Sequence, residues 1–131
     1  MPGYAIVNLL EIDDAVAGRA PGLEGRFGRT HLGSSELGVS HWRYAVGTRN
    51  QAHSHREQEE AYVVVAGSGR VRLDDELRDI RQWDVVRVAP EVVRGFEAGP
   101  DGLELIAVGG PRPEADDAVL PDTPWPDGSG S

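Results

Sequence analysis

Residues 47–69, GTRNQAHSHREQEEAYVVVAGSG, contain the most informative pattern in this 131-residue chain. His53 and His55 are two residues apart, so on a β-strand their imidazoles point to the same face. Glu60 stands at the start of the β-forming run that follows, and it can reach the same point from the neighbouring strand. Two neutral imidazoles and one carboxylate suit a first-row divalent ion and leave coordination positions open for a substrate. The pattern therefore predicts a metal site.

The spacing resembles the first sequence motif of the cupin superfamily, which is Gly, five residues, His, one residue, His, three or four residues, Glu, six residues and Gly. Five positions match this motif without a gap, namely Gly47, His53, His55, Glu60 and Gly67. Glu59 also fits the histidine spacing, but only Glu60 has a glycine at the required distance beyond it. A match of this length makes a polar surface loop the weaker interpretation. It identifies His53, His55 and Glu60 as the candidate metal ligands.

A second cupin motif, roughly Gly-Asp, then Pro, then His four residues later, is present only in part. Trp83-Asp84 stands where Gly-Asp is usual, and Pro90 is well placed. Arg94 then stands where the family has a His as its fourth metal ligand. An arginine stays protonated in proteins and cannot bind a metal ion. This departure makes metal occupancy an open question.

Three alternatives follow from the arginine at this position. In the first, the two histidines and Glu60 hold the metal alone, and Arg94 binds the carboxylate or phosphate of a substrate. In the second, Arg94 pairs with Glu60 in a metal-free site that binds an anionic molecule. In the third, the pocket is degenerate. The acidic exterior of the protein would not help to attract an anionic ligand in any of them.

The remaining sequence predicts an all-β fold. Its 17 glycines and 9 prolines favour many turns, and no segment of helical length has a 3.6-residue period. The expected strands are residues 4–10, 24–32, 37–46, 59–66, 70–73, 76–80, 84–88, 92–97 and 103–108, with turns at 67–69, 74–75 and 99–102. The resemblance covers residues 37–108 and implies a double-stranded β-helix, or jelly-roll barrel, of the RmlC-like cupin type.

We expect one domain with three parts. Residues 1–36 form an extended N-terminal strand and loop that pack on the barrel, residues 37–110 form the barrel, and residues 111–131 form an irregular acidic tail. The tail holds five of the 9 prolines and five of the 22 acidic residues, with one arginine. Trp125 is the exception in this tail, and two interpretations stay open. It is an anchor that docks on the body or on a second subunit, or it is an exposed side chain.

Three residues are candidates for substrate binding, namely Arg94, Tyr62 and His41. His41 and Arg43 share one face of the strand at residues 37–46. Trp42 and Tyr44 share the other face, which is more typical of a core or an interface. One of the two faces must line the barrel, and the alternation alone does not say which. The same ambiguity applies to the strand that includes Tyr62.

The composition excludes several classes of protein. There is no Cys and no Lys, which excludes thiol nucleophiles, disulfides, thiolate metal sites and Schiff-base lysines. The formal net charge of -9 disfavours a nucleic-acid partner. No apolar run is long enough to cross a bilayer, and no basic-then-apolar segment marks a signal peptide. We therefore expect a cytoplasmic protein without a membrane partner.

The resemblance implies a range of activities rather than one. Cupins include dioxygenases, sugar-phosphate isomerases and epimerases, decarboxylases and non-enzymatic binding domains, so the sequence does not establish that the chain is an enzyme. Our first hypothesis is a metal-dependent oxygenase or isomerase that acts on a small oxygen-rich, anionic molecule with Fe, Mn, Zn, Ni or Cu. The alternatives are a metal-free small-molecule-binding module and a regulatory domain with a vestigial pocket. The resemblance also implies a homodimer.

Overall fold

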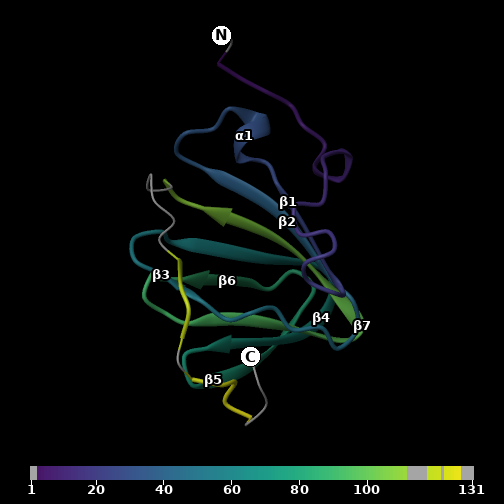
Figure 1. The fold of residues 1–131 in the computed structure, drawn as a ribbon, viewed down its shortest axis with the longest axis vertical. Coiled ribbons are helices and arrows are strands. Elements are labelled where there is room, and N and C mark those ends of the chain that lie inside the picture. The colour runs from purple at the N-terminus through teal and green to yellow at the C-terminus, as the bar shows by residue number, and fades with distance from the viewer. Residues whose placement is uncertain (1–2, 112–117, 122, 128–131) are drawn as a thin grey trace.

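The computed structural model describes residues 3–111, 118–121 and 123–127, and these form an all-β structure with little helix (Figure 1). The helical elements in these ranges are the 3-10 helix η1 (Leu9–Glu11) and the single-turn α1 (Arg29–Leu32). The strands in these ranges are β1 (Leu23–Phe27), β2 (Gly38–Tyr44), β3 (Ser54–His55), β4 (Glu60–Leu73), β5 (Glu76–Arg81), β6 (Val85–Val88), β7 (Arg94–Gly109) and β8 (Ala118–Val119).

The strands form two antiparallel sheets. The larger sheet has the order β1-β2-β7-β4-β5, and β6 also pairs with β4. The smaller sheet pairs β3 with β8. Antiparallel strands suit a chain whose connections are short turns, because consecutive strands can be joined by tight loops. This arrangement confirms the predicted all-β jelly-roll barrel.

The two longest strands bend at glycines in segments for which the sequence predicts turns. Residues 67–69 lie inside β4, and residues 99–102 lie inside β7, so both turn predictions were wrong. Gly67 and Gly102 have φ values of 75° and 76°, and a Cβ atom on Gly67 would overlap the carbonyl oxygen of Gly102. The register between β4 and β7 also shifts on both sides of Ala66 and Gly67. The glycines therefore bend a continuous strand pair instead of reversing the chain.

The N-terminal strand expected at residues 4–10 is absent from the described structure. Residues 9–11 form η1, which begins where the Asn8 side chain accepts a hydrogen bond from the Leu10 amide. Tyr4 and Ile6 are 79% and 95% exposed, and the segment projects beyond the end of the molecule that holds α1 (Figure 1). An apolar alternation does not form a strand without a neighbouring edge to pair with. The first strand is instead β1, which pairs with β2.

The hydrophobic core lies between the layers of the barrel. Its buried residues are Tyr44, Tyr62, Val64, Val71, Ile80, Val88, Phe96, Ala98, Leu103, Leu105 and Ala107. Alternate positions of β7 from Leu103 to Gly109 are buried, as expected for a strand with one inward face. The Phe96 ring packs on Tyr62, with 4.7 Å between the ring centroids. This packing fixes the start of β4, where the candidate site lies.

Described residues of the C-terminal segment pack against the body, beside β5 and β3 (Figure 1). Trp125 is only 1% exposed, and the Arg49 guanidinium lies over its ring at 4.2 Å from the centroid. A Cβ atom on Gly95 would come within 2.9 Å of the same ring, so the glycine makes room for it. The structure thus settles the two interpretations of Trp125 in favour of an anchor that docks on the body.

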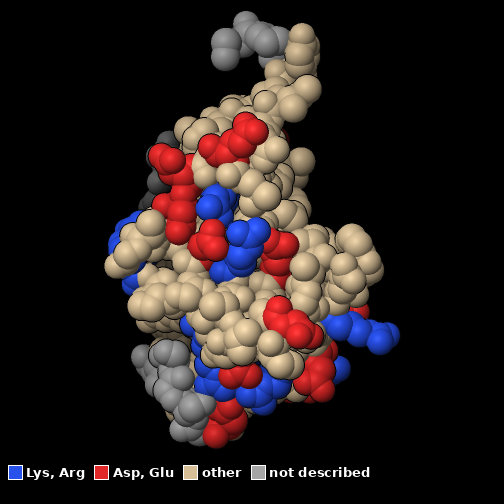
Figure 2. Space-filling model, turned by 90° about the vertical axis from the view of Figure 1, so that its right-hand side faces the viewer, with Lys and Arg blue, Asp and Glu red and all other residues tan. Residues whose placement is uncertain are grey.

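The charged surface mixes both signs. On the face in Figure 2, acidic and arginine side chains lie next to one another across the middle of the molecule. The ion pairs of the described residues include Arg43–Glu104 and Arg87–Glu59. None of the helices in the described parts of the chain has both the length and the apolar character needed to span a membrane.

Candidate metal centre

The two histidines and the glutamate of the first motif meet in the folded chain. His53 forms an isolated backbone bridge opposite Arg94, His55 lies on β3, and Glu60 is the first residue of β4. One ligand atom from each of the three side chains lies within 4.8 Å of the other two. The two imidazole rings are nearly perpendicular, at 87°, with 5.0 Å between their centroids. The structure therefore brings together all three residues that the spacing predicted.

Glu60 is held as an anion by three neighbours. Its Oε1 atom lies 3.3 Å from His55 Nε2, accepts a hydrogen bond from the Tyr62 hydroxyl at 2.5 Å, and lies 3.9 Å from Arg94 Nε. Burial alone would raise the pKa of Glu60, but the hydrogen bonds from His55 and Tyr62 and the charge of Arg94 bring it below its ordinary value. Glu60 is thus ionised, which is the form that binds a metal ion.

His53 is held in the neutral form. Burial lowers the pKa of His53, and the positive charge of Arg94 acts in the same direction, against the opposing effect of Glu60. A neutral imidazole is the form that binds a transition metal. Two imidazoles and an ionised carboxylate around one point therefore fit a first-row divalent ion, with His53, His55 and Glu60 as the residues that would hold it.

Arg94 is a buried cation next to Glu60. Its side chain is 0% exposed, and its guanidinium donates hydrogen bonds to the Ala89 carbonyl at 3.1 Å and the Pro90 carbonyl at 3.4 Å. Its backbone amide and carbonyl both bond to His53. Residue 94 is therefore adjacent to the histidine pair, as the second motif predicted, but its side chain does not line the neighbouring cavity.

A cavity of about 360 Å³ opens beside the three candidate ligands. Its lining comprises the three ligands and ten further residues, Phe27, Arg29, Thr30, Gly38, Val39, Ser40, Trp42, Gln58, Ala107 and Gly109. This volume is typical of a pocket for a small molecule. The rings of Phe27 and Trp42 lie 5.3 Å apart at the wall. An aromatic wall next to two imidazoles and a carboxylate can hold a small ligand and exclude water from part of it.

The other predicted substrate contacts lie outside this cavity. His41 is buried on the opposite face of β2, where its Nε2 atom lies 3.0 Å from Glu104. Tyr62 is buried in the core and reaches the site only through its hydroxyl on Glu60. Of His41, Trp42, Arg43 and Tyr44 on β2, Trp42 is the one that lines the cavity. The face of β2 that holds Ser40 and Trp42 is thus the one that borders the cavity.

Arg29 and Gln58 also line the cavity, and neither is predictable from the sequence motifs. Both lie outside the motif positions, and they reach the cavity through contacts between segments that are far apart in the chain. Arg29 lies on α1 and donates a hydrogen bond to the Gly110 carbonyl at 2.8 Å. Gln58 Nε2 donates to the same carbonyl at 3.3 Å. No local pattern around either residue indicates this convergence.

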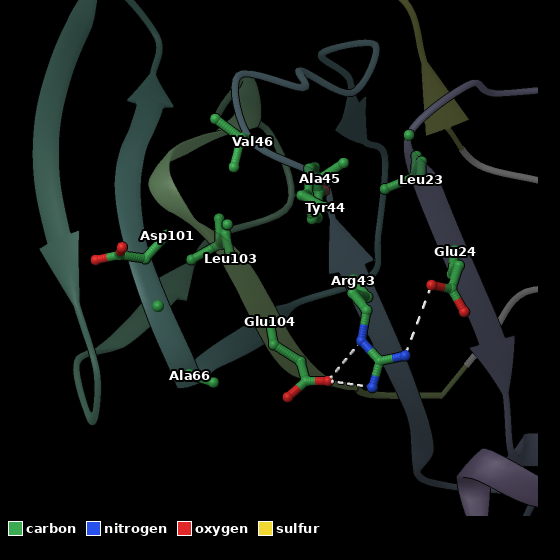
Figure 3. Close-up of a pocket in the computed structure, with 13 residues that line it drawn as sticks. Leu23, Glu24, Arg43, Tyr44, Ala45, Val46, Ala66, Asp101, Leu103 and Glu104 are labelled. Atoms are coloured by element: carbon green, nitrogen blue, oxygen red, sulfur yellow. Dashed lines mark hydrogen bonds and ion pairs between the residues drawn. The ribbon is translucent and has the colours of Figure 1, made fainter.

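A larger, open cavity of about 700 Å³ lies away from the histidines (Figure 3). Three of its charged groups already bind one another, because Arg43 donates to Glu104 at 2.7 Å and lies 3.6 Å from Glu24. Leu23, Val46 and Leu103 also line it. We therefore place the candidate chemistry in the smaller cavity, where a metal-ligating set and a pocket coincide.

Comparison with known families identifies the chain. The sequence profile described as "Cupin domain" matches residues 40–109, which is more than half of the chain. The chain belongs to the cupin family. The match begins within β2 and ends with β7, so it includes the candidate ligands of this cupin and Arg94. No curated protein matches the chain.

Solved structures share the fold of this cupin at low sequence identity. KdgF from Halomonas sp. is 19% identical with a TM-score of 0.71, and the match covers 84% of this chain and 96% of that one. The polyketide cyclase RemF from Streptomyces resistomycificus is 18% identical with a TM-score of 0.70, covering 90% and 87%. An oxalate decarboxylase variant from Bacillus subtilis is 18% identical with a TM-score of 0.75, covering 88% of this chain and 32% of that one. These similarities establish the fold alone.

Proposed function

We propose that this cupin binds a divalent transition metal on His53, His55 and Glu60 and acts as an oxygenase or isomerase on a small oxygen-rich, anionic molecule. The observation that supports the proposal is the coincidence of two features. Three ligand atoms lie within 4.8 Å of one another, and they border a cavity of about 360 Å³. Two of the structural neighbours are named for reactions of oxalate and of a polyketide, which supports an oxygen-rich substrate.

The residues of the chain have separate parts in this proposal. A metal held by the three candidate ligands would supply a Lewis acid for a substrate oxygen. His53 and Glu60 present a neutral imidazole and an ionised carboxylate, and the Tyr62 hydroxyl holds that carboxylate in place. Trp42 and Phe27 form an apolar wall that shields one side of the ligand from water. The buried Arg94 guanidinium partly offsets the negative charge of Glu60.

A screen of the metal-loaded protein tests this function. Purified chain is reconstituted with each of Fe, Mn, Zn, Ni and Cu and mixed with a panel of hydroxy acids, oxo acids and sugar phosphates. Oxygen uptake reports an oxygenase, and proton NMR reports an isomerase. We expect one metal to support turnover that Glu60→Gln abolishes and Glu59→Gln leaves intact, because Glu59 is exposed and pairs with Arg87. Binding of these molecules without turnover in any metal form would contradict an enzymatic function.

A metal-free binding module is the second candidate function, and one observation favours it. The contacts of Glu60 with His55, Tyr62 and Arg94 satisfy its Oε1 atom without any metal. In that case an anionic ligand would raise the melting temperature of metal-free protein. An equal rise in a His53→Ala/His55→Ala variant would show that the histidines do not take part in such binding.

A further inference from the structure

The cavity beside the candidate ligands contains a second charged group, the guanidinium of Arg29. This side chain is partly buried and lines the same cavity as His53, His55 and Glu60. It approaches from α1, on the side of the cavity where Gly38 and Gly109 face one another across β2 and β7. The cavity therefore places a positive charge and a potential metal centre around one volume.

Two glycines create the place where this guanidinium lies. A Cβ atom on Gly38 would come within 2.9 Å of Arg29 Cζ and would displace the group. On the opposite strand, a Cβ atom on Gly109 would come within 2.6 Å of the Gln58 amide nitrogen. Because both positions lack side chains, Arg29 and Gln58 lie on the sheet and line the cavity. Both also donate to the Gly110 carbonyl, which fixes their positions.

The Arg29 guanidinium keeps donors for a ligand. It donates to two backbone carbonyls, Gly110 at 2.8 Å and Ser35 at 3.3 Å, whereas a guanidinium carries five N–H donors. Among the residues that the structure describes, no carboxylate forms an ion pair with it. Other arginines differ, since Arg43 and Arg87 each lie against a glutamate. A cation in a pocket with spare donors and neutral partners is suited to an incoming anion.

We propose that Arg29 binds the carboxylate of a small organic acid whose other end lies at His53, His55 and Glu60. The position of that other end rests on the proposed function, whereas the contact with Arg29 does not. The Arg29 guanidinium carries one positive charge, and its planar N–H groups can donate two parallel hydrogen bonds to the oxygens of one carboxylate. The Phe27 and Trp42 rings at the wall favour an acid with a flat or apolar middle.

Calorimetric titration with matched acids and amides tests this proposal. The probes are benzoate and succinate, their neutral counterparts benzamide and succinamide, and phenyl phosphate. The proteins are the natural chain, Arg29→Gln, Arg29→Lys and the control Arg87→Gln, which removes an exposed arginine outside the cavity. Gly38→Ala is a further variant that keeps the charge but displaces the guanidinium. Metal content and melting temperature are measured for each protein.

We expect the natural chain to bind at least one acid more tightly than its amide. Arg29→Gln and Gly38→Ala should weaken binding of that acid by about 10- to 100-fold and leave amide binding and metal content unchanged. Arg29→Lys should retain part of the affinity, and Arg87→Gln all of it.

Three results would overturn the proposal: no preference for either acid over its amide, equal acid affinity in Arg29→Gln, or tighter binding of phenyl phosphate than of benzoate. Loss of acid binding in Arg29→Gln with no metal in any of the proteins would support the Arg29 contact while contradicting the proposed metal function.

Discussion

At the scale of single residues, the site depends on how the Glu60 carboxylate is held. Tyr62 is two residues along β4, so its side chain shares a face with Glu60 and its hydroxyl reaches Oε1. Burial and the negative charge of Glu60 hold the pKa of Tyr62 well above its ordinary range, so the hydroxyl stays a donor. Such supporting hydrogen bonds orient metal ligands and raise metal affinity.

Replacing Tyr62 by phenylalanine removes this donor and keeps the ring that packs on Phe96. We expect Tyr62→Phe to lower metal affinity about tenfold, because Glu60 loses the bond that orients it. Tyr44→Phe is the matched control, since Tyr44 is a buried core tyrosine that also packs on Phe96. Competition with a metal-sensitive dye measures both affinities. Equal affinity in Tyr62→Phe and the natural chain would show that the hydroxyl does not orient the ligand.

Arg94 gives a second prediction at this scale. Its backbone is bonded to His53 and its side chain points to Glu60, so Arg94→His would remove a buried cation and add an imidazole near the other ligands. We expect metal affinity to rise by about tenfold or more. Arg72→His is the matched control, because Arg72 is also buried but binds Thr123 and the Asp74 carbonyl. No gain in Arg94→His would mean that residue 94 does not face the histidine pair.

At the scale of elements, the small sheet connects the C-terminal segment to the site. β8 pairs with β3, and His55 lies opposite Ala118 in that pair. Farther along, Thr123 accepts a hydrogen bond from buried Arg72, and Trp125 is buried beneath Arg49. The strand that supplies one candidate ligand therefore pairs with a segment that Thr123 and the buried Trp125 hold on the body.

Removing the ring of Trp125 should weaken the whole protein. We expect Trp125→Ala to lower the free energy of unfolding by about 3 kcal/mol, the usual cost of deleting a fully buried large aromatic side chain. Trp83→Ala is the matched control, because Trp83 is 69% exposed. Its effect should stay within about 0.5 kcal/mol. Urea unfolding followed by circular dichroism measures both variants, and equal effects of the two substitutions would argue against docking of Trp125 on the body.

The elements also show what a sequence can and cannot predict. The hairpin at Asp74-Asp75 was predicted correctly, because two strand-forming runs flank a short polar turn. The turn predicted at Gly67 was wrong. A glycine with positive φ can form either a chain reversal or a bend within a strand, and here pairing with β7 makes it a bend. The convergence of His53, His55 and Glu60 was predictable from spacing along neighbouring strands. The position of Arg29 was not, since only contacts between distant segments place it.

At the scale of the whole molecule, clusters of arginine and carboxylate side chains join segments that are distant in the sequence. Glu97 on β7 lies 2.5 Å from Arg49 and 2.8 Å from Arg70, and both arginines also contact Asp127 near the C-terminal end. Burial alone would raise the pKa of Glu97, but hydrogen bonds from Arg70 and Arg49 bring it below its ordinary value of 4.5. The cluster should therefore make stability depend on pH.

The sign of that dependence follows from the lowered pKa. A carboxylate with a lower pKa in the folded state contributes stability that is fully present above its unfolded pKa and is lost as the pH falls through the folded pKa. We expect the urea concentration at the unfolding midpoint of the natural chain to decrease as the pH is lowered below about 5. Glu97→Gln should make this decrease smaller. Glu76→Gln, at an exposed position on β5, is the control. An unchanged acid dependence in Glu97→Gln would show that Glu97 does not contribute.

The predicted homodimer also belongs to this scale and stays a prediction. Tyr4, Ile6 and Leu10 leave apolar surface exposed on the N-terminal segment, which is a surface that a second copy would cover. Such a dimer would leave the cavity residues on each chain, since His53, His55, Glu60 and Arg29 all come from one copy. Neither the proposed function nor the Arg29 contact therefore depends on it.

The most direct test of the central claim is the metal content of untagged protein purified without chelators. We predict close to one equivalent of a first-row transition metal per chain by mass spectrometry. The double variant His53→Ala/His55→Ala should lose it, whereas His31→Ala should keep it, because His31 lies on α1 and does not line the cavity. Protein that stays metal-free after reconstitution with each of Fe, Mn, Zn, Ni and Cu would contradict the metal centre.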